Sequence, residues 1–183
     1  MKKSGSFLKK SFLFLSAALL SVAVLSAQET KKDDKLIGDS KEAKAAFIKG
    51  DRLMEKLFSS SYGYVIFPHV GKGAVGVGGA AGGGIVYEKG NAIGAAQMTQ
   101  LTVGLQLGGK VYREVIFFEN KAALNTFTDG KFEFAAQMSA VAVKAGVSAD
   151  ARYRDGVMVF SQERAGLMYE ASVGGQKFSY KAF

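Results

Sequence analysis

The chain has no cysteine and only one histidine and one proline among its 183 residues. Without cysteine it can form no disulfide framework, no cysteine-ligated metal site and no lipid-modified N-terminal cysteine. The single histidine, His69, also leaves no histidine cluster for a metal. The folded protein must therefore be stabilised by its hydrophobic core alone, and the chain is long enough to build one.

The charged residues argue against two further kinds of site. No acidic run has the D-x-D-x-D-G spacing of a calcium loop, so the sequence predicts neither a metal nor another cofactor. The formal charge is +8, from 24 Lys and Arg against 16 Asp and Glu, but four of the lysines lie at the extreme N-terminus. The remaining excess is modest, its signs are mixed and there is no Lys/Arg run, which argues against nucleic acid as a partner.

The N-terminal residues have the order of a secretory signal peptide. Four lysines precede an apolar stretch at 12–25, small residues follow, and polar residues begin at Gln28. The apolar stretch is shorter than the about 20 residues that a membrane-spanning helix needs, and an uncleaved anchor is the alternative. We therefore expect a signal peptide at 1–27, a flexible lead-in at 28–38 and one domain at 39–183, exported to the periplasm or cell envelope.

Residues 39–58 are predicted to form an amphipathic helix. Asp39 or Ser40 would cap its N-terminus, and Glu42 would complete a capping box. At about 100° per residue one face is apolar and the opposite face is basic. Such a helix either packs on the core of a globular domain or lies on an anionic membrane with its apolar side chains inserted. The residues that would make the membrane contact are Lys41, Lys44, Lys49, Arg52, Lys56, Phe47, Leu53 and Leu57.

The rest of the chain predicts strands. The segment 71–109 contains 13 of the 23 glycines, which disfavours helix and marks bends or close approaches between strands. The apolar run at 64–67 is predicted to be a strand that Pro68 stops, and Asn120 would cap a short helix at 121–128. Further strands are expected at 73–78, 83–88, 91–98, 101–109, 111–118, 132–147, 156–161, 167–173 and 178–183, with turns at 88–91, 164–166 and 174–176. The alanines of 132–147 also allow a helix there, but its alternating apolar residues favour a strand.

The predicted fold class follows from the short connections between these strands. They leave no room for crossover helices, which excludes a parallel doubly wound sheet. We predict an α+β fold with a curved, mostly antiparallel, glycine-rich sheet, barrel-like or sandwich-like in shape. An N-terminal amphipathic helix precedes the sheet, and one short helix is inserted in it.

Three short patterns point only weakly to a function. Residues 71–76 match G-x-G-x-x-G, but the glycines that follow are poor helix formers, so no dinucleotide site is expected. Gly78 and Gly82 match the G-x-x-x-G of membrane helices within a run too short to span. His69 could serve a hydrolase, but no G-x-S-x-G elbow is present, which favours a structural or surface role.

Five segments, in their order and spacing, resemble the SYLF domain family, and the resemblance covers residues 63–180. The segments are GYVIFP at 63–68, GKGAVGVGG at 71–79, VGLQLGG at 103–109, EVIFF at 114–118 and GLMY at 166–169. The resemblance implies binding rather than catalysis, because members of this family bind phospholipids and the yeast members also bind actin. It also implies that an amphipathic segment at the start of the domain, here 39–58, takes part in lipid binding.

These observations lead to three hypotheses. The first is an exported, non-enzymatic protein that binds anionic phospholipid at a membrane surface of the envelope, where it could also have a protein partner. The alternative is a structural or scaffold protein of the envelope that assembles through its glycine-rich sheet. The third, a hydrolase acting on a polar envelope substrate, would need a buried polar cluster around His69. The sequence does not determine the oligomeric state, and an exported protein would not meet actin.

Overall fold

The structure is a computed structural model, and it describes residues 28, 30–130, 133–134, 141–142 and 152–183. The chain divides into two compact units, Met1–Lys35 and Leu36–Phe183. In the first unit, residues 28 and 30–35 are helical. Among the described residues, none of the helices combines the length and the apolar composition of a membrane span.

The second unit places two helical segments before the sheet and one helix within it. In chain order the elements are a helical segment at 36–50, α2 (Arg52–Ser60), β1 (Gly63–Glu88), β2 (Asn91–Phe118), α3 (Lys121–Thr128), β3 (Glu133–Phe134), β4 (Val141–Ala142) and β5 (Val157–Ala182). The sheet order is β1-β2-β5-β3, and β4 pairs with β5. All pairings are antiparallel except β4 with β5, so the predicted α+β fold with a mostly antiparallel sheet is confirmed.

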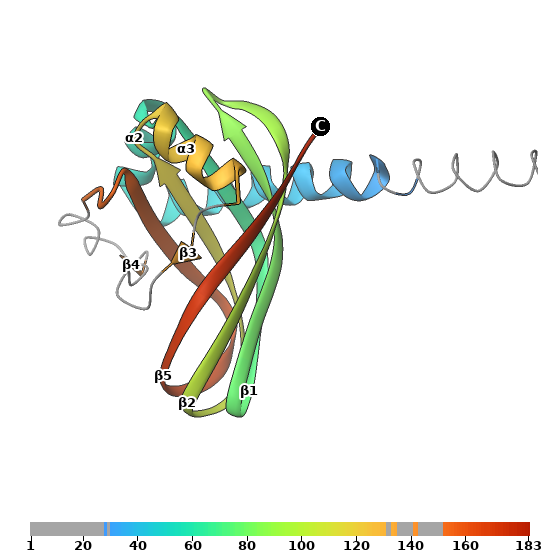
Figure 1. Cartoon of the computed structure of the whole chain (residues 1–183), viewed down its shortest axis with the longest axis vertical. Coiled ribbons are helices and arrows are strands. Elements are labelled where there is room, and N and C mark those ends of the chain that lie inside the picture. Colours follow the sequence, from blue (N-terminus) through green and yellow to red (C-terminus); the bar gives the residue numbers. More distant parts are fainter. Residues whose placement is uncertain (1–27, 29, 131–132, 135–140, 143–151) are drawn as a thin grey trace, which may run out of the picture. The chain divides into compact units, whose positions relative to one another are not determined.

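The three long strands turn back on themselves, which gives the sheet its curvature (Figure 1). In β1, residues 63–70 lie against residues 82–88. A Cβ added at Gly84 would come within 2.7 Å of the carbonyl oxygen of Ile66, and one added at Gly82 would come equally close to the carbonyl oxygen of His69. Glycine at these positions therefore lets the two halves of one strand approach more closely than side chains would allow.

Several strands predicted as separate elements are continuous. The strands expected at 73–78 and 83–88 belong to β1, and those expected between 91 and 118 form β2. The turns predicted at 164–166 and 174–176 are wrong, because both lie inside β5, where residues 165–166 and 174–176 pair with β2 and Arg164 stands at a shift in register. Their glycines do not end a strand, since the neighbouring strand continues beside them and supplies hydrogen-bond partners.

The hairpin turn predicted at 88–91 is confirmed. β1 ends at Glu88 and β2 begins at Asn91, while Lys89 and Gly90 between them have φ angles of 48° and 83°. Two consecutive residues with positive φ are what a two-residue hairpin turn of type I′ requires.

The helix predicted at 121–128 is also confirmed as α3, and the side chain of Asn120 caps it by accepting from the amide of Ala123 at 3.0 Å.

Pro68 does not stop the first strand, contrary to the prediction. β1 continues through it, and the register with β2 shifts between Phe67 and Val70. Because proline has no N–H to donate, strands tolerate it at bulges and along edges.

Only Glu133–Phe134 and Val141–Ala142 of the strand expected at 132–147 are described, and both are strand; the rest of that prediction lies outside the described residues.

The helix predicted at 39–58 is divided in two and begins earlier. Residues 30–38, where a flexible lead-in was expected, are helical, so Asp39 and Ser40 lie inside a helix instead of capping one. The helical segment ends at Gly50, and Asp51 caps α2 by accepting from the amide of Leu53 at 2.8 Å. Glycine followed by aspartate favours this break, because glycine weakens a helix and aspartate is a strong N-cap.

Two clusters of buried side chains form the core of the second unit. One includes Phe67, Phe118, Phe127 and Phe178, and it joins α3 to the sheet. The other includes Phe47, Met54 and Leu57 of the two helices, packed with side chains of β1, β2 and β5. The opposite faces of the glycine-rich strands are therefore both covered in the region near the helices, and the second cluster fixes the helices to the sheet.

Candidate functional site

The basic side chains proposed for lipid contact have two different environments. Lys41, Lys49, Arg52 and Lys56 are exposed. Lys44 is half-buried: its Nζ donates to the hydroxyl of Tyr64 at 3.2 Å and lies 4.9 Å from the centre of the Phe58 ring. Burial lowers the pKa of the Lys44 ammonium group. Four of the five cations are thus available to a partner, while Lys44 contributes to the contact between helix and sheet.

The apolar side chains proposed for membrane insertion are packed in the core instead. Phe47 and Leu57 are buried in the cluster between the helices and the sheet, and Leu53 is half-buried against it. Full burial of one large apolar side chain stabilises a protein by about 1.5 to 3 kcal/mol. Exposing Phe47, Leu57 and their buried neighbours Met54 and Phe58 would therefore cost about 6 to 12 kcal/mol, comparable to the whole stability of a typical domain.

Polar contacts fasten the same helical segment to the sheet. The Tyr87 hydroxyl donates to the Ser40 hydroxyl at 3.2 Å, and both residues are buried. The Gln162 side-chain amide donates to the carbonyl oxygen of Ala46 at 3.4 Å, while its own oxygen accepts from Arg113 at 2.7 Å. Because these contacts accompany the apolar packing, they oppose release of the helix, and insertion of its apolar face is not the mode of binding that this geometry favours.

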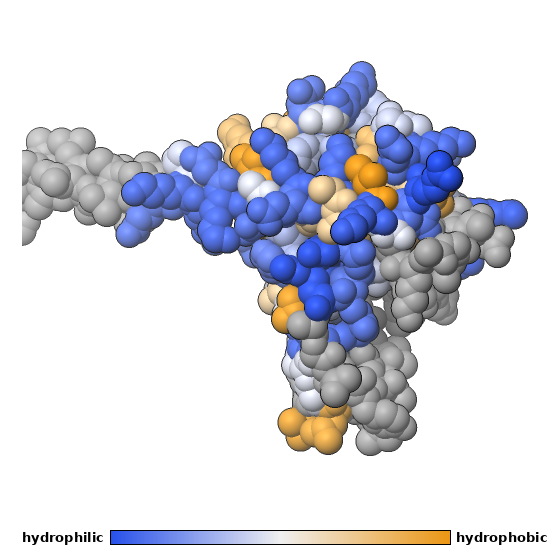
Figure 2. Space-filling model, turned by 180° about the vertical axis from the view of Figure 1, so that it is seen from behind, coloured by the Kyte–Doolittle hydropathy of each residue, from blue (hydrophilic) through white to orange (hydrophobic). Residues whose placement is uncertain are grey.

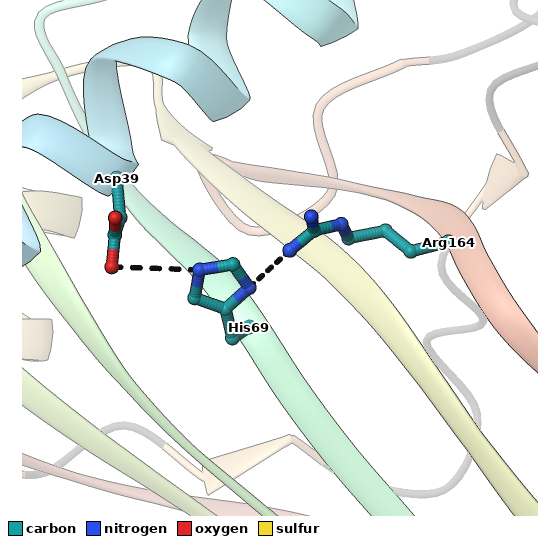
Figure 3. A network of polar contacts seen from close by, with 3 residues as sticks. All are labelled: Asp39, His69 and Arg164. Carbon is teal, nitrogen blue, oxygen red and sulfur yellow. Dashed lines mark hydrogen bonds and ion pairs between the residues drawn. The ribbon is translucent and has the colours of Figure 1, made fainter.

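His69 forms a bridge between three elements (Figure 3). Its Nε2 lies 3.5 Å from Oδ2 of Asp39 in the 36–50 segment, and its Nδ1 contacts Nη1 of Arg164 in β5. Since a guanidinium can only donate, Arg164 is the donor of this contact. The His69 side chain is 48% exposed, and its described partners are a carboxylate and a guanidinium rather than a hydroxyl nucleophile. The arrangement therefore supports a structural bridge and not the buried cluster that a hydrolase would need.

The structure also exposes large apolar side chains that sequence reasoning did not select. Among the described residues they include Val75 in β1 and Leu107 in β2, which are Cα partners in the sheet. Figure 2 shows an apolar patch at the lower end of the sheet, where the strands turn back. Both residues stand among glycines, and that pattern predicted strands without indicating which of their side chains would face solvent.

Parts of this chain are similar to known proteins. Residues 99–182, from β2 through the end of β5, match the family described as Ysc84, Las17-binding protein actin regulator. This match confirms the resemblance to the SYLF family over residues 99–182. It is also 28% identical over 130 residues to Beta cell expansion factor A from Aeromonas veronii, covering 67% of this chain and 47% of that protein. The chain thus spans about half the length of this relative.

Proposed function

We propose that this protein binds anionic phospholipid at a membrane surface of the cell envelope and has no catalytic activity. The match of residues 99–182 to the SYLF family supports a role in binding, and the N-terminal signal-like sequence supports export. The observation that carries the proposal is the exposure of four cations, Lys41, Lys49, Arg52 and Lys56, on helices whose apolar face is already occupied. The attachment is therefore electrostatic.

The size of this attraction follows from the charges. Each Lys or Arg close to an anionic membrane contributes about 1 kcal/mol, so four contribute up to about 4 kcal/mol, or roughly a thousandfold in partitioning. Glu42 and Glu55 are exposed on the same helices and reduce the net attraction. Salt weakens such contacts because the Debye length falls to about 3 Å at 1 M.

Vesicle sedimentation tests the proposal. We expect the protein to pellet at low salt with vesicles of phosphatidylcholine and phosphatidylglycerol, and to remain in the supernatant with phosphatidylcholine alone. Replacing the four exposed helix cations with glutamine should abolish most of this binding. The matched control replaces four exposed cations elsewhere with glutamine, Lys121, Arg152, Arg154 and Lys177.

The control separates a specific surface from a general charge effect. It removes the same charge and should keep most of the vesicle binding. Equal losses in both variants would refute the helix surface as the site. Failure of the unaltered protein to pellet with anionic vesicles at low salt would refute phospholipid binding itself.

The alternative, an envelope scaffold that assembles through the sheet, draws its support from Val75 and Leu107. Exposed aliphatic side chains on neighbouring strands could make a contact between protein molecules. Sedimentation velocity without lipid distinguishes the two functions. Concentration-dependent assembly without vesicle affinity would favour the scaffold, whereas a species of constant size that pellets with anionic vesicles would favour lipid binding.

A further inference from the structure

Three large aliphatic side chains of β1 and β2 are exposed to an unusual degree. Val75 is 82% exposed, Leu107 is 64% exposed and Leu101 is 66% exposed. Val75 and Leu107 lie opposite one another on paired strands, and we call this pair the apolar tip. The register of β1 and β2 is irregular immediately after Val75, where the strands turn back. A pair of apolar side chains presented at a bend is a candidate contact surface.

Charged residues are sparse in β1 and β2 around the apolar tip. The stretches 73–79 and 101–109 contain no charged residue, and neither β1 before Glu88 nor β2 before Glu114 contains an acidic one. The neighbouring strand β5 adds Glu170, in register with Gln106. Along β1 and β2 themselves the charges closest to the tip are therefore cations, while Glu170 of β5 lies nearer to the tip in register than either lysine.

These cations lie at a distance that fits the thickness of a membrane interface. Lys72 and Lys110 are Cα partners, each three residues from the tip. At about 3.3 Å per residue, they lie about 10 Å along the strands from Val75 and Leu107. Apolar faces of peripheral proteins enter the headgroup and acyl boundary by about 5 to 10 Å. An inserted tip would thus bring the level of this pair to the phosphates, where Lys110 is half-buried with its Nζ 3.6 Å from Oε1 of Glu163 and Lys72 is buried.

We propose that the apolar tip inserts into the surface of a phospholipid bilayer and provides the apolar anchor that the docked helices cannot provide. The inference rests on the proposed phospholipid binding and adds a second contact to it. The aromatic residue nearest to the tip in register is Tyr169 of β5, opposite Leu107. The tip is aliphatic, and the uncharged stretches of β1 and β2 on either side of it contain no aromatic residue and no arginine, the residues that anchor most protein interfaces. Lipid is therefore favoured over a second protein molecule as the occupant.

A single tryptophan reports insertion directly, since the chain has no tryptophan of its own. The Leu107→Trp variant places the reporter at the tip, and Phe183→Trp, at an exposed position at the C-terminus, is the control. With vesicles of phosphatidylcholine and phosphatidylglycerol we expect a blue shift and quenching by brominated acyl chains for Leu107→Trp only. Both substituted residues are exposed, so neither change should impair folding, which thermal unfolding would verify.

A polar double variant, Val75→Thr with Leu107→Gln, tests the contribution of the tip to binding. Losing the burial of two aliphatic side chains should weaken vesicle partitioning by at least about tenfold. The loss should persist at high salt, because apolar burial is not screened as the helix contact is.

The outcomes separate this inference from the proposed function. If the protein pellets with anionic vesicles while the reporter at position 107 stays unshifted and the double variant binds normally, the tip inference is wrong and lipid binding stands. If the unaltered protein does not pellet at all, both fail. If the double variant instead changes the sedimentation coefficient in the absence of lipid, the tip is a protein interface and the inference is overturned.

Discussion

Glu114 is a buried carboxylic acid in β2 whose protonation should control stability. It is 1% exposed, and one carboxyl oxygen, Oε2, accepts from the side-chain amide of Gln176 at 3.1 Å. The other, Oε1, is buried without a hydrogen-bond partner among the described residues. Burial raises the pKa of this carboxyl to about 7, and the Gln176 hydrogen bond offsets only part of that effect. The charged form is therefore the unfavourable one in the folded protein.

The sign of the pH dependence follows from the two pKa values. Because the pKa of Glu114 is about 7 in the folded protein and 4.5 ordinarily, the folded state binds the proton more tightly than the unfolded state. This group should therefore lower the free energy of unfolding as the pH rises from about 4.5 to about 7. At about 1.4 kcal/mol per pH unit, the penalty above pH 7 is about 3 kcal/mol.

The Glu114→Gln variant removes the charge and keeps nearly the same shape. We expect its stability relative to the natural chain to increase by up to about 3 kcal/mol between pH 4.5 and pH 8. Urea unfolding at a series of pH values measures this difference. Comparing the two chains cancels the titration of other groups, and Glu119→Gln, at an exposed position, is the control.

Two results would refute the reasoning. One is a stability difference between Glu114→Gln and the natural chain that stays constant from pH 4.5 to pH 8. The other is an equal pH-dependent change in Glu119→Gln, which would show that loss of any carboxylate, rather than the buried one, produces the effect.

Two further predictions concern the backbone. Gly84→Ala should cost about 1 to 3 kcal/mol, because its Cβ would lie 2.7 Å from the carbonyl oxygen of Ile66. Gly73→Ala meets no atom within 4 Å and should change stability by under about 0.5 kcal/mol; equal effects would contradict the close approach. Asp51→Ala should cost about 1 kcal/mol by removing the cap on Leu53, and unchanged urea unfolding would contradict that role.

Local signals were sufficient where the determining contacts are local. The turn at 88–91 and the cap at Asn120 depend on residues within a few positions of each other, and both were predictable from the sequence. The residues Gly50 and Asp51 also favour the break before α2, so a local signal for it is present in the sequence. The helical periodicity on both sides of the break is continuous enough to hide it, so the single helix predicted at 39–58 merged two elements.

The long strands could not be predicted in this way. A glycine in a turn and a glycine inside a paired strand look alike in sequence, and β5 contains glycines of the second kind at positions predicted to be turns. At Gly84 the deciding contact is with Ile66, on the other half of the same strand. Such contacts arise only after the sheet has turned back, and residue spacing does not reveal them.

The same limitation explains why apolar helix residues that were predicted to contact a membrane are packed in the core instead. Amphipathic spacing identified an apolar face and a basic face on the N-terminal helices, but it could not show that the sheet would cover the apolar one. Phe47 is buried there, while Val75, in a segment that gave no comparable signal, is exposed. Since an apolar side chain can serve only one partner at a time, we place the apolar anchor of the proposed membrane contact at the bend of the sheet and its charges on the helices.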